Sequence, residues 1–192
     1  VGKFDEMYKQ FDNPWNQSND EYYSSVSRRS VCHFIEKYKI NSMVEWGCGL
    51  GETSNYIKEN TRSNIDIMGI DISLTAINKA RVNFPNIKFK NDDILNIANY
   101  KNYQCMFFSE ITWYLLQDKK INIIFNSLRN EFPKGSLFLH QLSFYKEGIQ
   151  KYGTDYFTNL NEFIEFCPFK LLAKLDCEYE DGIETLCLFE IS

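Results

Sequence analysis

A glycine-rich stretch in the first third of the chain constrains the fold more than any other feature. Residues 44–51 read Val-Glu-Trp-Gly-Cys-Gly-Leu-Gly, an apolar run followed by alternating glycines. Glycine has no Cβ, so Gly47, Gly49 and Gly51 permit positive φ angles and let a ligand approach the main chain. Residues 52–58 are predicted to begin a helix whose free N–H groups face this loop. The stretch therefore predicts a strand, a tight turn and a helix that together form a nucleotide-binding loop.

A second strand, expected at residues 66–70, ends at Asp71, where an acidic residue of a βαβ unit accepts hydrogen bonds from a ribose. The dinucleotide fingerprint G-x-G-x-x-G would need glycine at position 52, which is Glu52. Glu45, beside the loop, would repel a pyrophosphate and attract a cation. The sequence thus predicts a cationic ligand that contains ribose, and it disfavours an NAD-linked reductase.

Four segments in this order resemble the class I S-adenosylmethionine-dependent methyltransferases. Residues 44–51 resemble motif I of that family, and Asp71 resembles the acid of motif II. Residues 89–94 are similar to the third segment and residues 107–115 to the fourth, which in the family lies beside the transferred methyl group. S-adenosylmethionine carries a sulfonium, an α-ammonium and no phosphate, which suits Glu45.

The resemblance implies S-adenosylmethionine as cofactor and S-adenosylhomocysteine as product. In the third segment the acid meets the adenine amino group; the register favours Asp93, and Asp92 is the near alternative. The cofactor-binding residues implied by the four segments are Glu45, Gly47, Cys48, Gly49, Gly51, Asp71, Ile72, Asp92, Asp93, Ile94 and Ser109.

The N-terminal region resembles that of the nodulation-type (NodS-like) N-methyltransferases, which carry a D-P-W-like element followed by a tyrosine and a basic residue. Residues 12–16 read Asp-Asn-Pro-Trp-Asn, and residues 109–115 are close to the S-E-x-x-x-Y-L pattern of that group. The resemblance implies that Trp15 and Tyr23 close over the cofactor and that Arg28, or its neighbour Arg29, pairs with the cofactor carboxylate. A hydrophobic plug at Trp15 and a solvated helix face at the arginines remain alternatives.

A chain of 192 residues with 44% hydrophobic residues is long enough for one sizeable core, so a single domain spanning 1–192 is expected. We predict a Rossmann-like α/β fold with a seven-stranded, mostly parallel sheet, one antiparallel C-terminal strand and helices on both faces. Residues 1–40 would form an N-terminal cap and helix, and residues 143–158 a lid or substrate loop. Helices are expected at 20–38, 73–84, 118–132 and near 163–166; the remaining strands are expected at 87–89, 104–109, 136–142, 169–177 and 184–191.

Methyl transfer from a sulfonium is an in-line displacement, so it depends chiefly on positioning. A hydroxyl acceptor benefits from a general base, whereas an amine must be neutral to attack. His140 is the first candidate for the base and Glu110 the second; the alternatives are a structural histidine and a carboxylate that holds the cofactor's methionine portion or the acceptor. Trp113, Tyr114 and Tyr145 are candidate acceptor contacts, with simple packing as the alternative for the aromatic pair at 113–114.

Composition narrows the function classes. A net charge of −5 and a pI near 5.2 argue against a nucleic-acid partner. Six cysteines without zinc-ligand spacing indicate a reduced, cytoplasmic protein without structural metal, and no apolar stretch reaches the roughly twenty residues of a membrane span. The expected acceptor is a small molecule or a carbohydrate-linked hydroxyl or amine, including a surface-glycan or phosphoramidate group. A nucleic-acid methyltransferase and a non-catalytic S-adenosylmethionine-binding protein are the alternatives, and the sequence does not indicate an oligomeric state.

Overall fold

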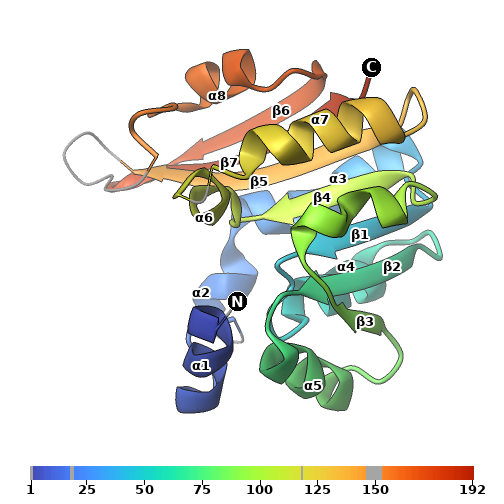
Figure 1. Ribbon diagram of the computed structural model, residues 1–192, viewed down its shortest axis with the longest axis vertical. Helices are drawn as coiled ribbons and strands as arrows, with labels where there is room; N and C mark the ends of the chain where they lie inside the picture. The colour runs from blue at the N-terminus through green and yellow to red at the C-terminus, as the bar shows by residue number, and fades with distance from the viewer. Residues whose placement is uncertain (1, 18–19, 118, 146–152) are drawn as a thin grey trace.

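The computed structural model describes residues 2–17, 20–117, 119–145 and 153–192 (Figure 1). A seven-stranded sheet with the order β3-β2-β1-β4-β5-β7-β6 runs through the molecule. Strands β1 to β5 pair in parallel, and β7 pairs antiparallel with both β5 and β6, which confirms the predicted fold class. The strands are β1 (Ser42–Trp46), β2 (Asp66–Asp71), β3 (Lys88–Asn91), β4 (Cys105–Ser109), β5 (Leu137–Tyr145), β6 (Lys170–Glu178) and β7 (Gly182–Glu190).

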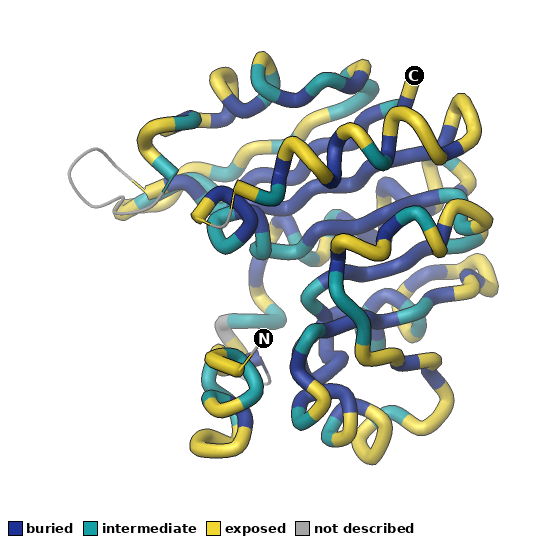
Figure 2. The backbone as a smooth tube through the Cα atoms, in the orientation of Figure 1, coloured by how far each residue is buried: buried dark blue, intermediate teal, exposed yellow. Residues whose placement is uncertain are grey.

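Helices cover both faces of the sheet, and each face has its own apolar cluster. One cluster joins α3, α4 and α5 to the sheet, and the other joins η1, α6, α7 and α8. The central strands are consequently buried along their lengths, as is typical of parallel sheets (Figure 2). The helices are α1 (Gly2–Gln10), α2 (Asp20–Ser24), α3 (Val26–Tyr38), α4 (Glu52–Asn60), α5 (Leu74–Asn83), the 3₁₀ helix η1 (Ile94–Tyr100), α6 (Thr112–Gln117), α7 (Ile121–Glu131) and α8 (Leu160–Phe166).

Two predicted elements have different bounds in the structure. The helix expected at 20–38 breaks at Ser25, whose extended backbone (φ −52°, ψ 122°) ends α2 and whose side chain accepts a hydrogen bond from Arg28 N at the start of α3. Strand β5 continues to Tyr145, so Ser143 belongs to the sheet rather than to the predicted loop at 143–158. Residues 146–152 of that loop lie outside the described residues.

The N-terminal segment forms helix α1, which the sequence interpretation did not predict, and α1 packs beside α5 (Figure 1). The Asp5 carboxylate accepts hydrogen bonds from Ser73 Oγ and Thr75 N at the start of α5, each at 2.9 Å. In return, Lys79 Nζ donates to Tyr8 O at 2.9 Å near the end of α1. Each helix thus supplies a charge that stabilises an end of the other. Within the described residues, no helix is long and apolar enough to cross a bilayer.

Candidate functional site

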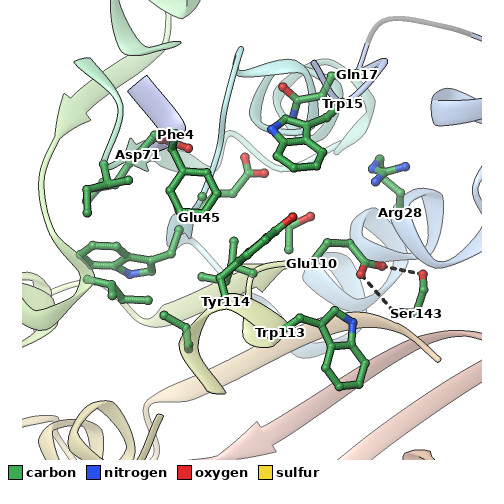
Figure 3. A pocket seen from close by; sticks show the side chains of 18 of the residues that line it. Phe4, Trp15, Gln17, Arg28, Glu45, Asp71, Glu110, Trp113, Tyr114 and Ser143 are labelled. Atoms are coloured by element: carbon green, nitrogen blue, oxygen red, sulfur yellow. Dashed lines mark hydrogen bonds between the residues drawn. The ribbon is translucent and has the colours of Figure 1, made fainter. Parts of the chain in front are cut away.

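A cavity of about 640 Å³ lies at the carboxyl edge of the parallel strands, within the roughly 300–1,000 Å³ typical of ligand sites (Figure 3). Its floor comes from the ends of β1, β2 and β4. The strand order reverses between β1 and β4, so the cavity occupies the topological switch point at which open α/β sheets bind ligands.

The glycine loop adopts the conformation that its sequence predicts. Gly47 and Gly51 have φ angles of 75° and 86°, which side-chain-bearing residues rarely adopt. A Cβ at Gly47 would lie 2.1 Å from Ile111 Cγ2, and one at Gly51 would lie 2.5 Å from the Phe89 ring. Gly47 lines the cavity, whereas the predicted cofactor residues Cys48, Gly49 and Gly51 are not among its lining residues and shape the loop behind it.

Glu45 lies beneath the loop and lines the cavity, although its side chain is only 1% exposed. One carboxylate oxygen accepts a hydrogen bond from Ser54 Oγ. Burial raises the pKa of Glu45 to about 7, and Ser54 and Arg28 only partly offset this effect. A cationic ligand group would stabilise the charged form, so the site is suited to an ammonium or a sulfonium.

Asp71, at the end of β2, also lines the cavity. Its Oδ2 accepts a hydrogen bond from Gly49 N at 3.0 Å and its Oδ1 accepts one from Ser73 N at 2.8 Å. Burial raises the pKa of Asp71, and these backbone bonds oppose the shift. Each oxygen has a second lone pair, so the carboxylate can still accept ligand hydroxyls. The adjacent Ile72 lines the cavity as well.

The two acids after β3 differ in how their oxygens are engaged. Asp92 accepts hydrogen bonds from Tyr100, Asn96 and the Asp93 backbone, and Lys90 pairs with it at 3.1 Å. The Asp93 carboxylate caps η1 by accepting a hydrogen bond from Leu95 N at 3.0 Å, which is the only bond to this carboxylate among the described residues. Both acids and Ile94 line the cavity, and Asp93 retains the greater capacity for a ligand.

The structure corrects the predicted position of Tyr23. Its hydroxyl donates a hydrogen bond to Glu52, and the side chain does not line the cavity, whereas that of Tyr22 does. Arg28 lines the cavity, whereas its neighbour Arg29 does not. Its guanidinium lies 3.5 Å from the centre of the Tyr22 ring, and Nη1 donates to Tyr22 O at 2.8 Å. The buried Nε–H has no hydrogen-bond partner among the described residues, which leaves a donor for an anionic group.

The N-terminal segment forms the roof of the cavity (Figure 3). Trp15 and Phe4 pack on the Tyr114 ring, with centroid distances of 6.1 and 5.1 Å. Gln17 Oε1 accepts a hydrogen bond from Leu50 N in the glycine loop at 2.9 Å. The sequence interpretation included Trp15 but missed Phe4 and Gln17, although aromatic residues at positions 4, 8 and 11 have the spacing of a helix face.

Glu110 follows β4 and has a φ angle of 59°, in the left-handed region that glutamate rarely adopts. Its Oε1 accepts a hydrogen bond from Ser143 Oγ at 2.7 Å, and its Oε2 accepts one from Ser143 N at 3.1 Å (Figure 3). Burial raises the pKa of Glu110. The neighbouring Ser109 also lines the cavity and donates to Gln141 Oε1 at 2.9 Å.

The three predicted acceptor contacts all reach the cavity, but to different extents. Tyr114 crosses its middle, beneath the roof (Figure 3). Trp113 packs edge-on against Phe144, with ring centroids 5.7 Å apart, so part of its indole belongs to the core. Tyr145 ends β5 and is 52% exposed.

His140 lies away from the cavity, which corrects its prediction as the first candidate for a general base. The side chain is 1% exposed, stacks on Phe163 with centroids 4.0 Å apart, and shares a 2.7 Å hydrogen bond between Nε2 and Thr112 Oγ1. Burial lowers the pKa of His140 to about 3. His140 is therefore a neutral residue of the core. Its stacking partner Phe163 and its hydrogen-bonding partner Thr112 do not line the cavity.

We therefore expect His140→Ala to destabilise the fold by about 2 kcal/mol or more, because it removes a buried ring from its stacked partner. The turnover number per folded molecule should stay within about twofold of the wild type. Chemical denaturation and a methyl-transfer assay on the same preparation measure the two quantities. A large loss of turnover with unchanged stability would return His140 to the catalytic site.

The C-terminal hairpin brings an unpredicted acid to the site. Glu184 on β7 is the cross-strand partner of Ser143 and lines the cavity together with Ser25. Its Oε2 accepts hydrogen bonds from Ser25 Oγ and Ser27 N at 2.9 and 3.1 Å, so it fixes the start of the helix that carries Arg28. Among the described residues, no three His, Cys, Asp or Glu side chains are grouped to hold a metal ion.

The fold and the cavity define a Rossmann-like α/β protein with its ligand site at the switch point. A family model described as a methyltransferase domain matches residues 38–154, and the chain belongs to this family. A protein of Invertebrate iridescent virus 6, provisionally named methyltransferase 235L, is 27% identical over 120 residues, which are 60% of this chain and 45% of that protein. The chain therefore spans less than half the length of this curated relative.

Solved structures with the same fold include PH0226 from Pyrococcus horikoshii OT3, with a TM-score of 0.73, 15% identity, and coverage of 97% of this chain and 99% of that one. They also include the N-methyltransferase NodS from Bradyrhizobium japonicum WM9 in complex with S-adenosyl-L-homocysteine, with a TM-score of 0.71, 15% identity, and coverage of 94% and 93%. The predicted family is thus confirmed, and the likeness to NodS holds at the level of the fold.

Proposed function

We propose that the protein is an S-adenosylmethionine-dependent methyltransferase that acts on a small-molecule or carbohydrate-linked acceptor. The observation that carries the proposal is the convergence of Glu45, Asp71 and Arg28 on one cavity at the switch point. These three residues suit three polar parts of the cofactor. Glu45 is a buried acid suited to the ammonium, Asp71 has lone pairs for the ribose hydroxyls, and Arg28 has an unpartnered N–H among the described residues for the carboxylate. The chain's membership of the methyltransferase family supports the same proposal. So does its likeness to NodS, which was solved in complex with S-adenosyl-L-homocysteine.

In this proposal each polar residue has one role. Glu45 holds the α-ammonium of the cofactor, Arg28 pairs with its carboxylate and Asp71 accepts from the ribose hydroxyls. Asp93 accepts from the adenine amino group, because its carboxylate is less engaged than that of Asp92. The bound cofactor supplies an electrophilic methyl group on a sulfonium.

The rest of the cavity would serve catalysis by positioning and by excluding water. Phe4, Trp15 and Tyr114 form an aromatic roof that limits solvent access to the middle of the cavity. Such a site lowers the barrier mainly by holding the acceptor in line with the methyl group.

With a net charge of −5, the chain is poorly suited to nucleic acid, and the free thiols of all six cysteines accord with a reducing, cytoplasmic location.

Calorimetric titration of the purified protein with S-adenosylhomocysteine and, separately, with NADH tests the proposal. We expect binding of the first at roughly micromolar Kd and none of the second. Binding of NADH alone would replace the proposal with a reductase. Binding of S-adenosylhomocysteine without methyl transfer to any of a broad panel of amines and hydroxyls would favour the non-catalytic alternative.

The role of Asp71 is tested by Asp71→Asn, a variant better suited than Asp71→Ala because it still offers one acceptor to the loop amides. We expect the affinity for S-adenosylhomocysteine to fall at least about tenfold, since an amide binds ribose hydroxyls more weakly than a carboxylate does. Calorimetry measures the affinity, and circular dichroism confirms the fold. Asp66→Asn, at the exposed start of the same strand, is the matched control. Unchanged affinity in Asp71→Asn would remove Asp71 from the cofactor site.

A further inference from the structure

The end of the cavity occupied by Arg28, Glu110 and Ser143 lies opposite Asp71 and Phe4 (Figure 3). In the proposed function, on which this inference rests, the cofactor extends from Asp71 past Glu45 toward Arg28. The walls beside Arg28, formed by Glu110, Ser143 and Glu184, are then left for the acceptor. Their chemistry indicates which kind of acceptor they receive.

Two carboxylates line this end, from strands far apart in the sequence. Glu110 lies at the end of β4 and is bound through both oxygens to Ser143 on β5. Glu184, on β7, is the cross-strand partner of the same serine. Three donors, from Ser25 and Ser27, are bound to its Oε2. Its Oε1 accepts no hydrogen bond from the described residues, and both glutamates, Glu110 and Glu184, line the cavity.

The backbone conformation and the burial of Glu110 both reduce the stability of the fold, so packing alone does not account for them. A glutamate in the left-handed region is strained, and burying a carboxylate beside a second one adds to the energetic cost. Within residues 2–17, 20–117, 119–145 and 153–192, the charged and titratable groups that face Glu110 are Arg28 on α3, Glu184 on β7 and Tyr145 on β5. The sole cation of this set, Arg28, stacks on Tyr22 and is the proposed partner of the cofactor carboxylate.

We propose that this end of the cavity binds the acceptor as an ammonium ion between Glu110 and Glu184, and that Glu110 takes the proton that must leave before methylation. An amine acceptor is methylated only as the free base. The ammonium gives one proton to a carboxylate oxygen of Glu110, which becomes the neutral acid, and the nitrogen keeps the electron pair. That pair forms the new N–C bond while the C–S bond breaks and its electrons remain on sulfur. Ser143 positions the Glu110 carboxylate through its backbone N–H and its hydroxyl.

A matched pair of probes, cyclohexylamine and cyclohexanol, tests the charge preference with nearly equal shape. Near pH 7.5 the amine is protonated, as a lysine side chain is. Each probe is titrated by NMR into the wild type saturated with S-adenosylhomocysteine. We expect the amine to bind at least about tenfold more tightly than the alcohol. Glu110→Gln and Glu184→Gln should each remove most of this preference, while Glu190→Gln, on β7 but paired with Lys170 outside the cavity, should retain it.

The outcomes separate this inference from the function on which it rests. Equal binding of the two probes, absence of amine binding, or preference retained in both glutamine variants would overturn the ammonium site. A loss of S-adenosylhomocysteine affinity in Glu110→Gln would also overturn it, because Glu110 would then hold the cofactor. If the wild type fails to bind S-adenosylhomocysteine, the proposed function itself fails before either probe is added.

Discussion

Glu45→Gln is expected to stabilise the free protein at pH 8 while weakening its affinity for S-adenosylhomocysteine. Burial raises the pKa of Glu45 from 4.5 to about 7, so between these values the folded state holds a proton that the unfolded chain has released. Stability therefore falls as the pH rises from about 4.5 to about 7, by about 3 kcal/mol in total. Glutamine stays neutral, so the variant avoids this loss, and its amide oxygen can still accept the hydrogen bond from Ser54.

The affinity for S-adenosylhomocysteine should fall roughly tenfold to a hundredfold in Glu45→Gln, because the ligand ammonium loses its counter-charge. Urea denaturation at pH 5 and pH 8 measures the stability, and calorimetry measures the affinity. The gain in the free energy of unfolding should be about 1 kcal/mol or less at pH 5 and largest at pH 8. Glu59→Gln, exposed on α4, is the control that should change neither quantity. An equal gain at both pH values would mean that Glu45 has an ordinary pKa.

In the proposed role of Glu45, the opposite signs of these two expected effects account for a buried acid at this position. A carboxylate without a counter-ion in an apolar setting costs stability, and the free protein bears that cost. A bound cation would remove this cost, because it would stabilise the buried carboxylate as water does at the surface, and the free energy recovered would favour binding. Stability given up at a site in exchange for function is a general feature of proteins.

The local parts of this architecture could be predicted from the sequence. Positive φ angles at Gly47 and Gly51, the N-cap at Ser73 and the strand that ends at Asp71 depend on residues within a few positions of one another. The seven-stranded sheet followed from the alternation of apolar runs and helical patterns, together with an Asp-Gly turn before β7. Such features are set by backbone chemistry and periodicity, which a single sequence displays.

The direction of side chains within a strand buried on both faces could not be predicted. Along β5, Phe138, His140 and Leu142 point to one face, whereas Gln141 and Ser143 point to the other, where Glu110 lies. Helices cover both faces, so both sets of positions carry apolar residues and the pattern shows no alternation. The sequence therefore placed His140 near the correct edge of the sheet but could not place it on the correct side.

Contacts between segments far apart in the sequence could not be predicted either. Glu184 reaches the site because β7 returns beside β5, and that register appears only when the hairpin is in place. Tyr22, rather than the predicted Tyr23, lines the cavity, because adjacent positions of helix α2 point in directions about 100° apart. The register leaves no signal within a short window of sequence.

Removal of residues 1–17 should cost more cofactor affinity than the single substitutions above. This segment supplies Phe4, Tyr8, Trp15 and Gln17 to the cavity, and Gln17 also binds the glycine loop at Leu50. The two apolar clusters that pack on the sheet contain none of these residues, so the remaining domain should stay folded. Without the roof, the affinity for S-adenosylhomocysteine should fall at least about a hundredfold, close to 2.7 kcal/mol.

A graded variant distinguishes loss of the roof from loss of the fold. Lys79→Met leaves every roof residue in place but removes the ammonium that holds Tyr8 O and Asp12 at the end of α1. It should lower the affinity by a smaller factor, about threefold to tenfold, with most of the change in the dissociation rate. Lys88→Met, which breaks an exposed pair with Asp66 away from the roof, is the matched control. If the truncated protein keeps a cooperative unfolding transition and wild-type affinity, the N-terminal segment does not close over the cofactor, and the cavity must be sealed from the acceptor side.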